Sequence, residues 1–166
     1  MMPRLLALFA FSTACALAGA ASAATTAAPE GWRTAVIRDE IAPQFSYDSG
    51  GGPDRTGAFV IESDQRAGLV GRWVKTFPVS GGRHYGFQAM RRVSRADGRR
   101  AAVVRLLWQD AKGKPVMHDE PSTASHKPGE KPRAEPEYPM DRATDARGWT
   151  VVADVYRAPS RAVQAV

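Results

Sequence analysis

Hydrophobic and polar residues alternate in short segments along most of the chain, and glycine, proline, aspartate and serine separate these segments. In the segment "GAFVIES", for example, Phe59 and Ile61 share one side of an extended chain, whereas Val60 and Glu62 face the other side. A period of two is typical of β-strands that cover a core with one face. The pattern therefore predicts a protein built of short strands and tight turns.

Several segments show this alternation, and one is apolar at nearly every position. We expect strands at residues 32–38, 57–63, 72–79, 85–93, 101–109, 149–157 and, at the end of the sequence, 160–166. Residues 101–109, "AAVVRLLWQ", are almost entirely apolar, which predicts a central strand that is covered on both faces. Pro78 has no amide hydrogen to donate, so its strand is expected to end there or to lie at a sheet edge.

Turn-forming residues stand between these segments. Ser80-Gly81-Gly82 predicts a tight turn between two strands, Asp97-Gly98 predicts a hairpin, and residues 110–114 predict a further turn. The residues after the first turn could also place their apolar side chains on one side of a helix. Gly86 and the abundance of aromatic residues favour a strand there instead.

Regular alternation is lost between residues 117 and 147. This range contains "HDEPSTASHKPGEKPRAEPEYP", which is rich in proline and charge and has almost no aliphatic side chains. Such a segment buries too little apolar surface to become ordered through burial alone. We therefore expect a long proline-rich loop at about 117–147, which is either disordered or functional.

The first residues have the pattern of a secretory signal peptide. Arg4 precedes a short apolar stretch, and Ala21-Ser22-Ala23 then fits the small-residue cleavage site of such peptides. The apolar stretch is too short for a transmembrane helix, which needs about 20 residues. We expect cleavage after Ala23, no transmembrane segment afterwards, and export to the periplasm or the extracellular space. The expected organisation is a signal peptide at 1–23, a disordered leader at 24–30 and a folded module at 31–166.

Cleavage would remove Cys15, which is the one cysteine of the sequence. The mature chain could then form no disulfide and would have no cysteine nucleophile or thiolate metal ligand. Without Arg4 it would carry 22 lysines and arginines against 17 acidic residues, a net charge of +5. A basic balance favours anionic partners. In the expected compartment these are acidic glycans or envelope surfaces rather than nucleic acid, unless the arginines serve only solubility.

Short strands, turns rich in glycine and aspartate, and no clear amphipathic helix together predict an all-β protein. The expected fold is an antiparallel β-sandwich or jelly roll. The last apolar segment stops at Val166 without a turn or a polar tail. Two interpretations stay open: a short last strand, or a jelly roll that lacks its last strands in this sequence.

Three stretches resemble carbohydrate-binding-module-like, or galactose-binding-like, jelly-roll modules. They are "KTFPVSGGRHYGFQAMRRV", "AVVRLLWQDAKGKPV" and "DRATDARGWTVVADVYRAPSRAVQAV". The likeness covers most of residues 57–166 apart from the long loop. More narrowly, it is similar to modules ahead of catalytic domains in exported bacterial proteins, including nitrilase-type carbon–nitrogen hydrolases. The resemblance implies a non-catalytic module that binds carbohydrate or envelope material, or an accessory domain whose catalytic partner lies beyond Val166. The nitrilase-type catalytic set includes a cysteine, which the mature chain lacks.

Binding of sugars relies on exposed aromatic rings that stack on C–H faces, beside polar groups that bind hydroxyls. The candidate ligand-binding residues are Trp73, Tyr85, Trp108 and Tyr138, with Gln88, Arg92 and Arg105 as polar partners. Each aromatic residue has a second interpretation. Trp73 and Tyr85 also fit core positions of strands, Trp108 fits either role, and Tyr138 is either a ligand contact or an anchor of the loop.

Other chemistries find little support in the sequence. The three histidines, His84, His118 and His126, lack the paired spacing of zinc ligands. A structural calcium ion stays open, and its candidate ligands are Asp48, Asp54 and Asp154. No G-x-S-x-G, H-E-x-x-H or phosphate-binding glycine motif is present. We therefore expect no enzymatic activity from this chain.

Two groups of charged residues could be functional or could simply be solvated surface charges. The carboxylates of the long loop are expected to be solvated rather than catalytic, namely Asp119, Glu120, Glu135 and Glu137. An arginine cluster flanks the predicted hairpin, and it consists of Arg91, Arg92, Arg95, Arg99 and Arg100. It could grip an anionic glycan or form a solvated hairpin tip. A basic surface of this kind also supports an alternative function, a structural or protein-interaction sandwich.

Overall fold

The computed structural model describes residues 27–94, 101–120, 131 and 133–166. It confirms an all-β fold with antiparallel sheets, consistent with a β-sandwich. The ten strands of the described residues are β1 (Trp32–Val36), β2 (Gln44–Asp48), β3 (Ala58–Glu62), β4 (Gly71–Lys75), β5 (Phe77–Pro78), β6 (His84–Arg91), β7 (Trp108–Gln109), β8 (Met140–Thr144), β9 (Thr150–Arg157) and β10 (Gln164–Ala165). A short 3₁₀ segment, η1 (Asp39–Ile41), connects β1 to β2. The expected signal peptide and the Asp97-Gly98 hairpin lie outside the described residues.

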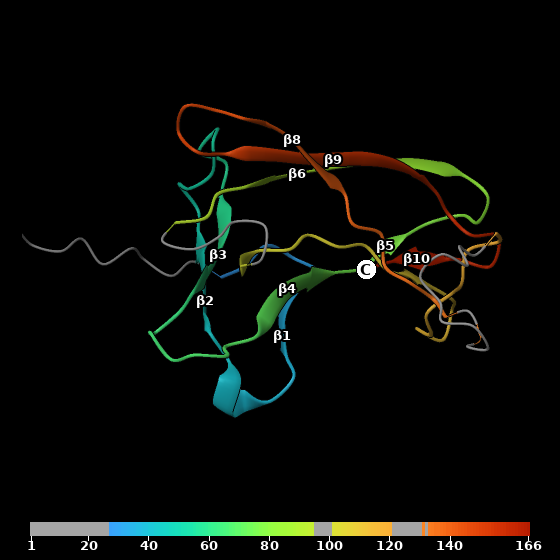
Figure 1. Cartoon of the computed structure of the whole chain (residues 1–166), viewed down its shortest axis with the longest axis horizontal. Helices are drawn as coiled ribbons and strands as arrows, with labels where there is room; N and C mark the ends of the chain where they lie inside the picture. Colours follow the sequence, from blue (N-terminus) through green and yellow to red (C-terminus); the bar gives the residue numbers. More distant parts are fainter. Residues whose placement is uncertain (1–26, 95–100, 121–130, 132) are drawn as a thin grey trace, which may run out of the picture.

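Two antiparallel strand pairs form the first part of the chain, β1 with β4 and β2 with β3 (Figure 1). Aromatic rings join the two pairs. The Phe59 ring of β3 lies 4.3 Å from the Trp32 ring and 5.1 Å from the Trp73 ring, measured between centroids. Phe45 of β2 meets Trp73 edge to face at 5.6 Å. Alternate positions of these strands carry the rings, so strand pairing brings them to one side.

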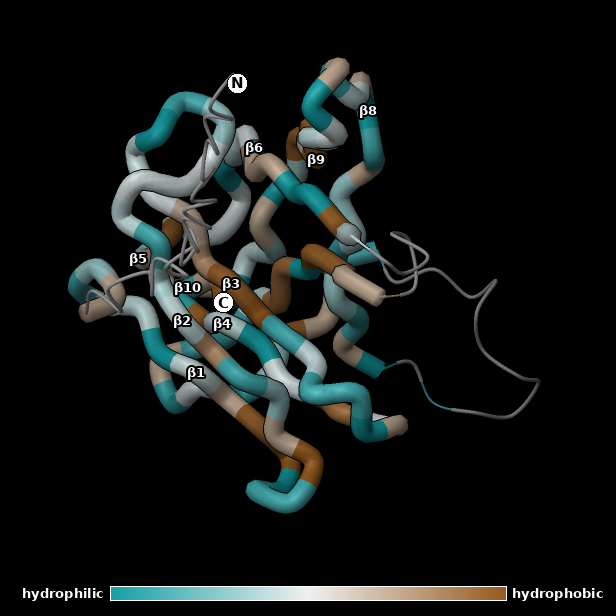
Figure 2. Tube along the Cα trace, turned by 90° about the vertical axis from the view of Figure 1, so that its left-hand side faces the viewer, coloured by the Kyte–Doolittle hydropathy of each residue, from teal (hydrophilic) through white to brown (hydrophobic). Residues whose placement is uncertain are grey.

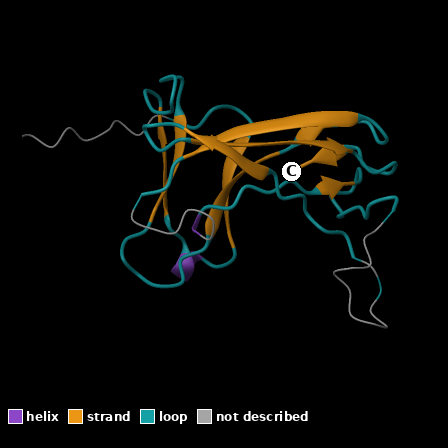
Figure 3. Ribbon diagram, turned by 45° about the horizontal axis from the view of Figure 1, so that its top comes forward, coloured by secondary structure: helices purple, strands orange, loops and turns teal. Residues whose placement is uncertain are grey.

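Two three-stranded sheets form the second part, with the orders β6-β9-β8 and β5-β10-β7. β6 and β9 pair along their whole lengths, from His84 opposite Arg157 to Arg91 opposite Thr150. They are the two longest strands and extend side by side in Figures 1 and 3. Along β6 exposed and half-buried residues alternate, which confirms the alternation expected for this segment.

The hydrophobic core lies against the β5-β10-β7 sheet. Trp108 is 1% exposed and is surrounded by Val116 and three small buried residues, Ala158, Ala162 and Ala165. The alanines let the backbone approach the indole closely, since they have no long side chain to displace it. Half-buried side chains of Tyr85 and Tyr156, among others, complete this core. Figure 2 shows hydrophobic and hydrophilic residues alternating within single strands.

The predicted turn at Ser80-Gly81-Gly82 is confirmed, and it carries the chain from one sheet to another. The Arg83 amide donates to the Ser80 carbonyl oxygen at 3.3 Å, and Gly82 has a positive φ of 77°. β5 precedes the turn and β6 follows it, yet these strands belong to different sheets. β5 is an edge strand, as Pro78 predicted. The segment 72–79 is therefore divided between β4 and β5.

The prediction of a central strand at residues 101–109 is wrong. The structure has a strand only at β7, and Leu106 makes a single bridge to Glu137. Val103 is 56% exposed, so the first half of the segment is not covered on both faces. The reason is the short neighbour: β10 offers only two residues for pairing with β7.

Part of the expected loop at 117–147 forms β8, and β2 is a strand that the pattern analysis missed. β8 has the sequence "MDRAT", which is mostly polar and carries no aliphatic alternation. It forms by pairing with the edge of β9, where Arg142 Nε also donates to the Ala153 carbonyl at 3.0 Å. A turn at Asp145 joins the two strands, and Gly148 has a positive φ of 82° there. Backbone pairing thus orders a segment that burial alone would not.

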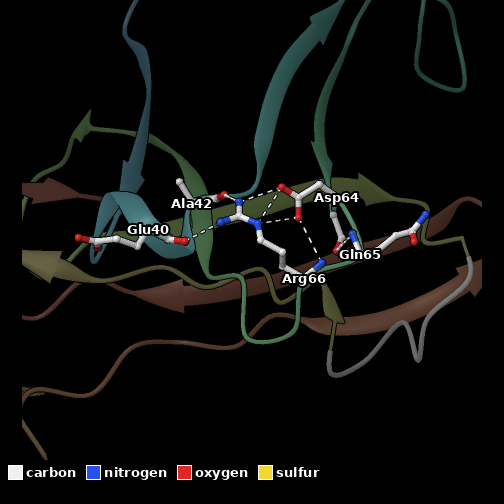
Figure 4. A network of polar contacts seen from close by, with 6 residues as sticks. Glu40, Ala42, Asp64, Gln65 and Arg66 are labelled. Carbon is white, nitrogen blue, oxygen red and sulfur yellow. Dashed lines mark hydrogen bonds and ion pairs between the residues drawn. The ribbon is translucent and has the colours of Figure 1, made fainter.

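Arg66 fastens the loop between β3 and β4 to the segment around η1 (Figure 4). Its guanidinium donates to the carbonyl oxygens of Glu40 at 2.7 Å and Ala42 at 3.1 Å. The same side chain pairs with the carboxylate of Asp64 at 2.8 Å, and the hydrogen bonds from Arg66 lower the pKa of that carboxyl group. One side chain therefore connects this loop to the η1 segment and at the same time pairs with a carboxylate of its own loop.

Replacement of Arg66 by alanine is expected to loosen residues 63–70 without unfolding the protein. The variant removes the donors to Glu40 and Ala42, while the aromatic contacts of the strand pairs stay in place. Hydrogen exchange followed by mass spectrometry should show faster exchange in peptides covering 63–70. Arg33 is exposed on β1, and its alanine variant is the matched control with unchanged exchange. Equal exchange in both variants would contradict the fastening role.

Candidate functional site

An open pocket of about 330 Å³ lies between the end of β6, the start of β8 and the segment before β7. Its lining residues are Arg91, Val103, Val104, Tyr138, Pro139, Met140 and Asp141. The volume is at the lower end of the range for small-molecule sites, which runs from about 300 to 1,000 Å³. The pocket combines one aromatic ring, several apolar side chains and one pair of opposite charges.

The charged pair belongs to β6 and β8. Arg91 lies opposite Thr150, and Asp141 lies opposite Val152, so the register places both side chains on the same face of the β6-β9-β8 sheet. Arg91 Nη2 is 2.6 Å from Asp141 Oδ2, and Nη1 donates to the Ala102 carbonyl at 2.6 Å. The two side chains are 13% and 24% exposed. The pair therefore fixes the segment that contains Ala102 to the sheet and gives one side of the pocket its polarity.

Tyr138 supplies the exposed ring of the pocket. It is 58% exposed, and Pro139 beside it is buried. The preceding residue, Glu137, holds the backbone in place: it donates to the Leu106 carbonyl at 2.7 Å and accepts from the Leu106 amide at 3.0 Å. The aromatic side chain is therefore presented to solvent from an anchored backbone, which limits the entropy lost when a ligand stacks on it.

The Glu137 side chain points to the core rather than to solvent. Its Oε1 accepts a hydrogen bond from Trp108 Nε1 at 3.0 Å and lies 3.3 Å from His118 Nε2. The expectation of a solvated carboxylate is wrong for this residue, because the backbone bridge to Leu106 turns the side chain toward the indole. Asp119 is also engaged, since the amide and hydroxyl groups of Ser160 donate to its carboxylate at 2.7–3.0 Å.

The residues predicted to bind ligand do not come together in one place. Trp73 lies half-buried in the ring cluster of the first strand pairs, and its Nε1 donates to the Val60 carbonyl at 3.1 Å. Tyr85 packs against the core, and its hydroxyl accepts from the Ser80 amide at 2.7 Å. Tyr138 is the one residue of the seven ligand-binding candidates that lines the described pocket, and Arg91 of the predicted arginine cluster lines it too.

Trp108 requires a correction. It is buried, so its ring is not accessible for stacking on a ligand, and its role is that of the central core side chain. The sequence places it beside Gln109 and Asp110, where a loop-exposed ring was plausible. In the fold, however, the segment around Ala158 and Ala162 covers the ring.

The predicted polar partners lie at separate positions. Gln88 is exposed on the face of β6 opposite to Arg91, and Arg105 is exposed in the segment before β7. The Arg92 guanidinium lies 4.9 Å from the centre of the Trp149 ring. The arginine cluster is thus divided: Arg91 belongs to the pocket, Arg92 covers an aromatic ring, and the remaining three arginines lie outside the described residues.

Among residues 27–94, 101–120, 131 and 133–166, no group of three or more histidine, cysteine or acidic side chains is arranged to bind a metal ion. Asp48 and Asp54 accept hydrogen bonds within their own loop, from the Gly50 amide and from Thr56. Asp154 accepts from the Val155 amide at 3.0 Å. In the same part of the chain, no helix is long and apolar enough to cross a bilayer.

The chain matches no family model, no curated protein and no solved structure. The resemblance to carbohydrate-binding jelly-roll modules therefore stays a prediction.

Proposed function

We propose that this protein is an exported, non-catalytic β-sandwich module that binds glycan or cell-envelope material through the pocket at Tyr138. The accessory-domain role in a larger hydrolase is a variant of the same proposal. The observation that carries it is the exposed Tyr138 ring, which stands on an anchored backbone beside the Arg91–Asp141 pair.

The parts of the pocket fit the surface of a sugar. A sugar ring has a C–H face that packs on an aromatic ring, and hydroxyl groups that exchange hydrogen bonds with charged side chains. Tyr138 and Val103 supply apolar contact area, and Asp141 lies beside them. An open pocket also suits a polymer, since a chain of sugars must enter and leave at both ends.

Replacement of Tyr138 by alanine is expected to weaken glycan binding at least about tenfold, because a central aromatic contact of a small interface is worth more than about 1.4 kcal/mol. Isothermal titration calorimetry of the mature chain against dextran, xylan and polygalacturonate measures this affinity. The substitution should leave the melting temperature nearly unchanged, because the ring is exposed.

The matched control is Phe77→Ala, which removes another exposed aromatic ring from the edge strand β5. It should bind as the parent protein does. Tyr138→Phe keeps the ring and should retain most of the affinity. If no polysaccharide binds, or if Phe77→Ala and Tyr138→Ala weaken binding equally, the pocket is not the glycan site.

One observation favours the alternative, a protein-interaction sandwich. The face of the β6-β9-β8 sheet opposite to Arg91 carries exposed apolar side chains, Met90, Met140 and Val155. Val155 is 66% exposed in the middle of a long strand. Retention of envelope protein by the Tyr138→Ala variant, with no polysaccharide bound by the parent, would favour this alternative.

A further inference from the structure

Strand β6 has a long edge that no described strand covers. The sheet order is β6-β9-β8, so β9 pairs with one side of β6, and no strand among residues 27–94, 101–120, 131 and 133–166 pairs with the other side. Figure 2 shows β6, β9 and β8 in this order across the sheet. β6 has eight residues, whereas the other edge strands of the described residues have five or two.

The register shows which backbone groups of β6 face outward. The Ala158 amide donates to the Arg83 carbonyl at 2.8 Å, directly before the first pair of the ladder, in which His84 lies opposite Arg157. Hydrogen-bonded and non-hydrogen-bonded pairs alternate along an antiparallel ladder, so every second residue beginning at Tyr85 bonds to β9. The N–H and C=O groups of the remaining residues point away from the sheet. These outward residues are His84, Gly86, Gln88 and Met90.

The other edges of the two three-stranded sheets carry features that hinder pairing with another chain. β8 has a register shift between Asp141 and Thr144, and β5 consists of two residues, one of which is Pro78. β7 is equally short. β6 contains no proline and no lysine, its register has no shift, and its outward residues are all exposed. The edge of β6 is therefore suited to the addition of a further strand.

We propose that two copies of this chain form a homodimer in which the outer edges of their β6 strands pair antiparallel and join the two sheets into one. The outward residues lie symmetrically about Phe87. A two-fold axis at Phe87 places His84 opposite Met90 of the second copy and Gly86 opposite Gln88 of the second copy. Every outward N–H and C=O group then has a partner, in about eight hydrogen bonds.

The side chains of β6 fit the same arrangement. Phe87 of one copy meets Phe87 of the other in a non-hydrogen-bonded pair, where cross-strand side chains lie closest and aromatic pairs are favourable. Phe87 is only half-buried within one copy. At each end Arg91 lies opposite Arg83 of the second copy, and the Asp141 carboxylate, 2.6 Å from Arg91, balances the charge of Arg91. The edge is thus complementary to itself, which favours a second copy as its partner.

Sedimentation equilibrium of the mature chain tests the proposal. One pair of strands makes a small interface, so we expect weak association, with the average mass approaching twice the monomer mass between about 5 and 500 µM protein. Salt at about 0.15 M screens the repulsion between two positively charged copies. The dimer does not depend on glycan binding, so failure of either proposal leaves the other intact.

Amide exchange measured for single residues by NMR locates the interface. At the highest concentration, the outward amides of Gly86, Gln88 and Met90 should gain at least about fivefold protection by mass action. The amides of Phe87 and Ala89 already bond to β9 and should change less. This alternation within one strand is specific to edge pairing, and an increase in mass without it would overturn the proposal.

Gln88→Pro removes an outward N–H group but no hydrogen bond to β9. The variant should therefore fold and remain monomeric up to about 500 µM. Val155→Lys is the matched control, because Val155 is exposed on the same face but belongs to the central strand β9 and leaves the edge groups intact. It should associate as the parent does. If Gln88→Pro fails to fold, Gln88→Lys places a charge at the edge and serves instead.

The results that would overturn the dimer are distinct from one another. The first is a monomer mass at every concentration, and the second is association of folded Gln88→Pro as strong as that of the parent. The third is association that is lost in Val155→Lys and kept in Gln88→Pro. That last result would assign the contact to the apolar face of the sheet instead of the β6 edge.

Discussion

Replacement of Trp108 by alanine is expected to lower the free energy of unfolding by about 3–5 kcal/mol, the range for truncation of a large buried aromatic side chain. The indole is 1% exposed and lies among Val116, Ala158, Ala162 and Ala165. The alanines have no side-chain atoms that could turn into the space left by the ring, so collapse of the cavity would require backbone movement. The Glu137 carboxylate would also lose the Trp108 N–H donor.

Chemical denaturation monitored by circular dichroism measures this loss. Trp149→Ala is the control, because Trp149 is only half-buried and one side of its ring is covered by Arg92. Trp149→Ala should lower the free energy of unfolding clearly less than Trp108→Ala does. Equal losses for the two variants would show that the core around Trp108 contributes no more than the surface cluster does.

The sequence predicts β6 correctly, but it does not predict the conformation of the apolar run that ends at Trp108. The alternation of Tyr85, Phe87 and Ala89 describes a strand with one covered face, and local spacing is sufficient to predict it. The local sequence does not determine the conformation of the apolar run at 101–109. Whether it forms a long strand depends on the length of its partner, and β10 contributes two residues from the far end of the sequence.

The candidate site was predictable only in part, for a similar reason. Tyr138 stands among prolines and charged residues, where an exposed ring is unusual enough to be noticed. Arg91 and Asp141 are separated by 50 positions, and only the registers of β6 and β8 against β9 bring them together. No signal in the sequence marks Asp141, since β8 itself arises from pairing rather than from a hydrophobic pattern.

The turn at Ser80-Gly81-Gly82 was predicted from the sequence, and in the fold it also packs against the backbone of residues 159 and 160. Gly81→Ala tests how much this packing contributes to stability. A β-carbon on Gly81 would overlap the Ser160 carbonyl oxygen and approach the Pro159 carbonyl oxygen to 2.8 Å. Both groups are backbone atoms beside the buried core residues Ala158 and Ala162, so neither side can shift without disturbing the core. We expect a loss of about 3 kcal/mol in the free energy of unfolding, at the upper end of the usual cost of overpacking.

Two neighbouring glycines separate this effect from general consequences of adding a methyl group. Gly82 has a φ of 77° but open space around it, so Gly82→Ala should cost only about 1 kcal/mol of backbone strain. Gly86 lies in β6 with ordinary extended geometry and no atom within 4 Å of an added β-carbon. Gly86→Ala should therefore be neutral or stabilising by about 0.5 kcal/mol. Urea denaturation of the three variants should give this order; a Gly81→Ala variant as stable as Gly86→Ala would mean that residues 158–162 do not pack against the turn.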